Sequence, residues 1–151
     1  MNITYYGQSC FLLETAGKKL LFDPFITPNE LAKDIDVNSI QADYILVSHG
    51  HEDHTADLVD IAKGTGALVI SSFEIMVWLN KQGVTNCHPM NIGGQRKFDF
   101  GSVKMRLSRL GLEAEVASSW CLCCNNPVRI SDDFSVYQIQ HLNQFVQRIP
   151  M

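Results

Sequence analysis

Short apolar runs separated by turn residues open the chain. The runs that predict strands are Asn2–Tyr6, Cys10–Glu14, Lys19–Phe22 and Tyr44–Ser48. Gly7 and the pair Ala16-Gly17 mark the turns between the first three. Asp23-Pro24 ends the third run, because proline has no N–H to continue a strand ladder. The fourth run is apolar at successive positions, which is typical of a buried strand.

Helical spacing alternates with strand patterns after the fourth run. Thr55–Lys63 and Phe73–Gln82 have apolar positions on one side and are followed by glycines, so each predicts an amphipathic helix. We interpret Phe73 and Trp78 as core residues, and we explain Asp57, at the start of the first helix, by its interaction with the helix dipole. Ala67–Ser71 lies between them and predicts another buried strand. Arg96–Phe100 and Ser102–Leu107 predict a hairpin. This order predicts an α/β fold, with a partly parallel sheet and helices packed on it.

Composition and charge exclude several classes of protein. The chain has 151 residues, 46% hydrophobic and 19% charged, which is typical of a globular domain. The net charge of −4 favours neither a nucleic-acid nor an anionic-membrane partner. No apolar stretch is long enough to cross a bilayer, and the start lacks the pattern of a signal peptide, so we expect a cytoplasmic protein.

The five cysteines are unevenly placed. Cys10 and Cys87 lie in apolar, strand-like contexts, where a free thiol behaves as a small hydrophobic group. The other three, Cys121, Cys123 and Cys124, crowd together without the paired spacing of a structural zinc site. We interpret all five as reduced thiols without a ligand, with a soft-metal site at the crowded three as the weaker alternative.

The densest chemical signal is the segment His49-Gly50-His51-Glu52-Asp53-His54, directly after the fourth predicted strand. Loops at strand ends commonly present reactive groups from a rigid scaffold. Imidazole and carboxylate groups suit zinc and related divalent metals, and the spacing allows two separate ligand pairs. His49 and His51 can hold one ion, while Asp53 and His54 turn toward a second. The segment therefore predicts half of a two-metal hydrolytic centre.

This motif resembles the signature of the metallo-β-lactamase-fold hydrolases. Four blocks extend the resemblance to a bacterial and archaeal subfamily of metal-dependent hydrolases, and they are Met1–Glu14, Leu20–Phe25, Ala42–His54 and His88–Gly94. The likeness runs from residue 1 to about residue 105. It implies an αββα sandwich, of which this chain holds the N-terminal half, with a metal site at one edge of the two sheets. Residues 106–151 form an unmatched tail.

The resemblance also implies roles for single residues. It assigns His49 and His51 to one metal, and Asp53 and His54 to the other, with Asp53 and His54 also catalytic. It places Asp23 near the metals, where it could support the ligands; a turn-capping carboxylate is the alternative. Gln8 stands where close relatives often carry histidine, which leaves its role open.

The later ligands of the family are missing from this chain. Outside the motif only His88 and His141 remain. We interpret His88 as a turn or substrate-side residue and His141 as a surface histidine. We therefore expect one tightly bound divalent ion or none, with zinc as the metal, where the full-length family binds up to two.

Two explanations for residues 106–151 stay open. A shift of the reading frame near residue 106 is one, because synonymous codons for Arg106-Leu107-Ser108-Arg109, read one base later, can spell alanine-phenylalanine-histidine. A natural half-domain with its own C-terminus is the other. In either case we expect an uncovered sheet face, and with it a homo-oligomer or less specific self-association.

The function that follows is a zinc-dependent hydrolase that uses a metal-bound hydroxide on a small-molecule substrate. The fold does not select among esters, amides, thioesters and phosphodiesters. The alternative is a non-catalytic or degenerate metal-binding protein that lacks the late ligands.

Overall fold

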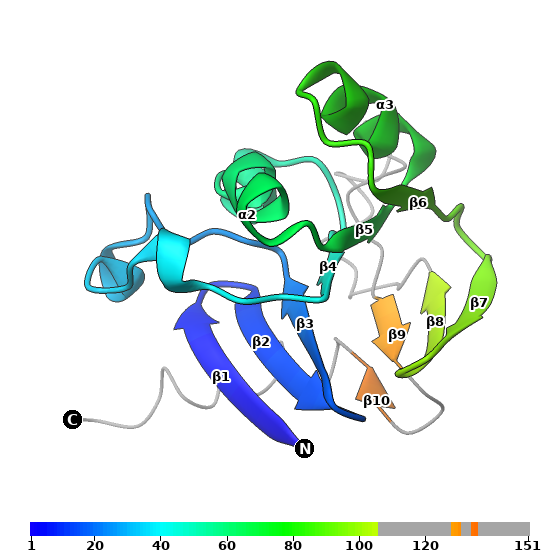
Figure 1. Ribbon diagram of the computed structural model, residues 1–151, viewed down its shortest axis with the longest axis horizontal. Helices are drawn as coiled ribbons and strands as arrows, with labels where there is room; N and C mark the ends of the chain where they lie inside the picture. Colours follow the sequence, from blue (N-terminus) through cyan, green and yellow to red (C-terminus); the bar gives the residue numbers. More distant parts are fainter. Residues whose placement is uncertain (106–127, 131–133, 136–151) are drawn as a thin grey trace, which may run out of the picture.

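The computed structural model describes residues 1–105, 128–130 and 134–135 (Figure 1). Cys121, Cys123 and Cys124, which crowd together in the sequence, and His141 lie outside these ranges. The strands are β1 (Asn2–Gly7), β2 (Cys10–Thr15), β3 (Lys18–Phe22), β4 (Tyr44–Leu46), β5 (Leu68–Ser71), β6 (Cys87–Pro89), β7 (Gln95–Phe98), β8 (Gly101–Met105), β9 (Val128–Ile130) and β10 (Phe134–Ser135). The helices are the 3-10 turns η1 (Glu30–Ala32) and η2 (Val37–Ser39), followed by α1 (Glu52–Thr55), α2 (Leu58–Thr65) and α3 (Phe73–Lys81).

The larger sheet contains the first six strands in chain order. β1, β2 and β3 pair antiparallel through tight turns, and β3, β4, β5 and β6 pair parallel. The predicted partly parallel sheet is therefore confirmed. Parallel neighbours require crossover connections, and α2 and α3 provide those between β4 and β5 and between β5 and β6. The carboxyl ends of β3, β4, β5 and β6 consequently meet along one edge of this sheet.

Two layers cover the larger sheet on opposite faces (Figure 1). On one face α2 and α3 pack over a core that includes Ile45, Val47, Leu58 and Leu79, each fully buried. On the other face lies the smaller sheet, with strand order β10-β9-β8-β7. Its described strands are antiparallel, and the predicted hairpin is present as β7 and β8.

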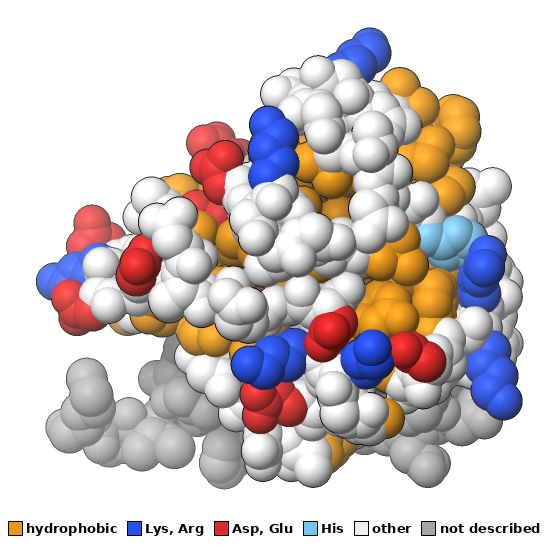
Figure 2. Space-filling view, viewed as in Figure 1, with side chains coloured by type: hydrophobic (Ala, Val, Ile, Leu, Met, Phe, Trp, Pro, Cys, Tyr) orange, Lys and Arg blue, Asp and Glu red, His pale blue; other side chains and the backbone are white. Residues whose placement is uncertain are grey.

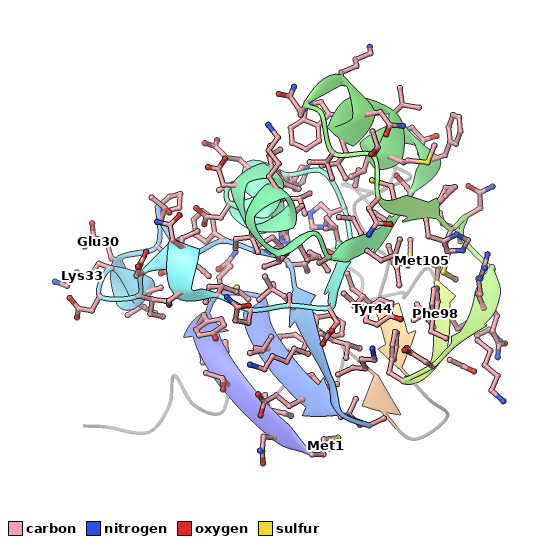
Figure 3. The ribbon with its side chains drawn as sticks, in the orientation of Figure 1. Met1, Glu30, Lys33, Tyr44, Phe98 and Met105 are labelled. Carbon is pink, nitrogen blue, oxygen red and sulfur yellow. The ribbon has the colours of Figure 1, made fainter. Side chains whose placement is uncertain are left out.

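A second core fills the space between the two sheets. Its members alternate with those of the first core along the strands, because successive side chains of a strand point to opposite faces. They are Phe11, Leu13, Leu20, Phe22, Leu46, Ile70, Met90, Phe100, Val103 and Met105. The face that we expected to be uncovered therefore carries buried side chains, and Figure 3 shows Tyr44 and Phe98 facing each other beside it. Self-association stays a prediction.

Three local expectations differ from the structure. The helix predicted at Thr55–Lys63 is observed as α2, which begins later, at Leu58 after Asp57, and the separate short helix α1 precedes it. His88 is not in a turn, since it pairs with Ile70 in β6. Phe73 and Trp78, which we interpreted as core, are 52% and 41% exposed on α3. Figure 2 shows a hydrophobic area beside α3.

Candidate metal centre

The histidine segment begins where β4 ends, at the edge formed by the carboxyl ends of the parallel strands. The backbone N–H of Val47 donates to the carbonyl of Ile70, and the Ser71 hydroxyl donates to the carbonyl of Val47. These bonds tie the start of the segment to β5. The segment then turns into α1, where the Thr55 hydroxyl donates to the carbonyl of His51. The loop is therefore held at both ends by hydrogen bonds.

His49 and His51 form the first pair of donor atoms. The Nε2 atom of His49 lies 3.0 Å from the Nδ1 atom of His51. Two imidazole nitrogens on one tetrahedral zinc ion, each about 2.0–2.1 Å from the metal, are separated by about 3.3 Å. The pair is thus spaced to share an ion. Without one, the same distance allows a hydrogen bond between the two rings.

Asp53 and His54 form the second pair. Their Oδ2 and Nε2 atoms are 3.7 Å apart, slightly wider than two ligands of one ion require. The rings of His49 and His54 have centroids only 4.0 Å apart, so the two pairs are adjacent. Residue types at both pairs, and the distance at the first pair, therefore fit divalent metals, with two ligands for each.

Asp23 contacts Ser48 and His54 and is almost completely buried, with 2% of its surface exposed. Its Oδ1 accepts the backbone N–H of Ser48 at 2.7 Å, and its Oδ2 accepts the Ser48 hydroxyl at 2.8 Å. The same Oδ2 lies 3.0 Å from Nδ1 of His54. A left-handed backbone at Asp23, with φ of 42°, turns the chain out of β3. That conformation costs an L-residue roughly 1–2 kcal/mol. The carboxylate thus has the contacts expected of a group that supports metal ligands, rather than those of a turn cap alone.

These contacts determine which histidine nitrogens carry hydrogen. The Ser48 hydroxyl donates its one hydrogen to Asp23, so it accepts from Nδ1 of His49, 3.0 Å away. His54 likewise donates from Nδ1 to Asp23. In both rings Nε2 is then left as a lone-pair donor facing the other member of its pair. Carboxylates and hydroxyls orient metal-binding imidazoles in this way.

The pKa values of the two buried imidazoles are shifted in opposite directions. Burial, together with the neighbouring His54, lowers the pKa of His49 to about 4. His49 is therefore neutral near pH 7, which is the form in which an imidazole binds metal. Burial alone would lower the pKa of His54 too, but the hydrogen bond and charge of Asp23, with the charge of Asp53, outweigh it and raise that pKa.

Two further polar residues near the segment make contacts across long sequence separations. Gln8, in the turn between β1 and β2, donates from Nε2 to Oδ2 of Asp53 at 2.7 Å. Asp57 accepts the backbone N–H groups of Ile26 and Thr27 at 2.6 and 2.9 Å and does not cap α2 with its side chain. Sequence reasoning left the role of Gln8 open and explained Asp57 by the helix dipole. No local pattern indicates either contact, because the partners are far apart in sequence.

The site is incomplete among the described residues. Within residues 1–105 and the two short described strands, no three His, Cys, Asp or Glu side chains converge on one ion position. His88 supplies no ligand to the histidine segment: its ring contacts Phe98, and Arg96 lies 3.4 Å from its Nε2.

Among the described residues, no helix has the length and apolar character needed to cross a membrane.

Comparison with known proteins identifies the family. The sequence profile of the beta-lactamase superfamily domain matches residues 2–111. The chain belongs to the beta-lactamase superfamily. A metal-dependent hydrolase of Methylacidiphilum infernorum is 52% identical over 103 residues, covering 68% of this chain and 46% of the relative. One of Shouchella clausii is 52% identical over 104 residues, covering 69% and 45%. This superfamily member thus spans about half the length of the curated relatives that it matches.

Solved structures agree with the superfamily fold. A metallo hydrolase from Ignicoccus hospitalis has a TM-score of 0.70 and 30% identity, covering 88% of this chain and 57% of that one. A diiron β-hydroxylase from Streptomyces venezuelae has a TM-score of 0.60 and 17% identity, covering 88% and 28%. The second likeness concerns the fold alone. The metallo-β-lactamase-like fold class is confirmed, and the matched part of this chain covers roughly half of the Ignicoccus hospitalis structure.

Proposed function

We propose that this chain carries the first half of the metal centre of a hydrolase, with His49 and His51 binding one divalent ion and Asp53 and His54 a second. The observation that carries the proposal is the pairing of donor atoms, 3.0 Å apart in one pair and 3.7 Å in the other. Its close relatives are named metal-dependent hydrolases, which supports the same conclusion.

The residues of the chain have distinct tasks in this proposal. Asp23 and Ser48 hold His49 and His54 with Nε2 directed at the metal positions. Asp53 supplies negative charge, which offsets the charge of a cation. A divalent ion held by these residues would supply a water molecule of lowered pKa and would polarise the bond to be cleaved. Zinc is the metal that we propose, because nitrogen and carboxylate donors suit it, and a small molecule is the proposed substrate.

A non-catalytic metal-binding protein is the second candidate. The absence of any group of three converging ligands among the described residues favours it. A catalytic zinc site has three protein ligands and an open position, whereas each pair here supplies two.

Metal analysis tests the proposed site. After dialysis of the purified chain, we expect one tightly held divalent ion or none, and we expect His51→Ala to weaken Zn²⁺ binding because it removes one ligand of the His49–His51 pair. Elemental analysis identifies the metal, and calorimetric titration with Zn²⁺ gives the affinity. Glu52→Ala is the matched control, because Glu52 is exposed between the ligand pairs and should leave binding unchanged. Two tightly held ions would contradict the expectation that the site is incomplete, and equal Zn²⁺ affinity in His51→Ala would contradict the assignment of His51 as a ligand.

A further inference from the structure

The β1–β2 turn directs one polar side chain at the metal centre. Gln8 donates from Nε2 to Oδ2 of Asp53 at 2.7 Å, across 45 residues of sequence. That same oxygen lies 3.7 Å from Nε2 of His54. A carboxylate oxygen has two lone pairs, so Oδ2 can accept the Gln8 amide and still face an ion together with His54.

The backbone around Gln8 is shaped for this direction. Gln8 has a left-handed φ of 54°, which an L-residue rarely adopts. Gly7 before it has φ of 104°, and a Cβ there would clash with Nδ2 of Asn29. The Tyr5 hydroxyl donates to the carbonyl of Gln8 at 3.1 Å. The surrounding contacts therefore hold Gln8 in a left-handed backbone conformation that is unfavourable by itself. Strained backbone conformations of this kind are most frequent at functional sites.

We propose that Gln8 is a positioning residue that holds the Asp53 carboxylate in the orientation needed for metal binding. The side chain of Asp53 is 44% exposed, so without a partner it would sample several rotamers. The amide nitrogen of Gln8 can only donate, and it selects the rotamer in which Oδ2 faces His54. This inference rests on the proposed function, since it takes Asp53 as a ligand.

Titration of the full 151-residue chain with Zn²⁺ and Co²⁺ tests the role. Gln8→Met keeps a side chain of similar length but removes the donor. We expect its affinity for both ions to fall about tenfold, with a change in the visible spectrum of bound Co²⁺. In an Asp53→Ala background, Gln8→Met should cause no further loss, because Gln8 acts through Asp53. An additive loss, or unchanged affinity in the single variant, would overturn the inference.

A pair of glycine substitutions separates positioning from backbone strain. Gln8→Gly relieves the left-handed conformation, so we expect equal or higher resistance to urea together with the same tenfold loss of affinity. Ala16→Gly relieves a similar conformation, with φ of 50°, in the β2–β3 turn at the opposite end of β3 from Asp23. It should raise stability and leave affinity unchanged. Normal affinity in Gln8→Gly would overturn the inference.

The same titrations distinguish the inference from the proposed function. If Asp53→Ala weakens binding but neither Gln8 variant does, the metal site stands and the role of Gln8 is wrong. If Asp53→Ala binds as the unsubstituted chain does, or the unsubstituted chain binds neither ion, the assignment of Asp53 fails and the inference falls with it.

Discussion

At the scale of single residues, Asp57 connects the loop after β3 to the start of α2. It is 5% exposed, and its carboxylate accepts two backbone N–H groups, from Ile26 and Thr27. Asp57→Ala would leave both groups without this acceptor, the N–H of Ile26 in a buried place and that of Thr27 in a partly buried one. Each such loss costs about 1–3 kcal/mol, so we expect the free energy of unfolding to fall by about 3 kcal/mol. Urea denaturation followed by circular dichroism measures this change.

The matched control is Asp60→Ala on the same helix. Asp60 is exposed in the first turn of α2, where its interaction with the helix dipole contributes about 0.3–1 kcal/mol. We expect a loss within that range. Equal losses in the two variants would show that Asp57 acts through the helix dipole, as its position in the sequence suggested, and that its hydrogen bonds contribute little.

At the scale of elements, the β7–β8 hairpin packs onto the larger sheet through Phe100. Its ring lies 4.4 Å from that of Tyr44, centroid to centroid, and the residue is 7% exposed. Removing a buried aromatic ring leaves a cavity and loses the transfer free energy of its atoms. Phe100→Ala should therefore lower the free energy of unfolding by about 3–5 kcal/mol, measured by urea denaturation.

Phe73→Ala offers the same chemical change on a different element. Phe73 is 52% exposed at the start of α3, so about 1 kcal/mol or less should be lost. A large loss there would mean that the exposed side of α3 is covered in solution. Similar small losses in both variants would contradict the packing of the hairpin against the sheet.

At the scale of the whole molecule, the chain spans 46% of a relative to which it is 52% identical. We expect the chain to hydrolyse activated esters and phosphodiesters far more slowly than a version with a family-type continuation after residue 105, because each metal has only two ligands in the pairs described. A panel of nitrophenyl substrates with and without a chelator makes the comparison. Equal chelator-sensitive rates would show that the short chain completes its site alone or as an oligomer.

The local patterns of the sequence account for much of the larger sheet and for the place of the metal segment. Branched and aromatic runs such as Tyr44–Ser48 form strands because their side chains can be buried on both faces of a covered sheet. The structure ends this strand at Leu46, and the histidine segment follows closely, as predicted. The candidate ligands His49, His51, Asp53 and His54 could be proposed from sequence because one short segment contains them all.

The contacts that support those ligands were decided by tertiary structure. Gln8 meets Asp53 across 45 residues, and Asp23 meets Ser48 across 25, because strand pairing brings distant turns to one edge of the sheet. Exposure was decided in the same way. Phe73 and Phe100 are the same residue type. Phe100 is buried because its hairpin packs over one face of the larger sheet, whereas Phe73 lies on α3 and is 52% exposed. Residue type by itself determines which surfaces are apolar, whereas the arrangement of neighbouring elements determines which of those surfaces are covered.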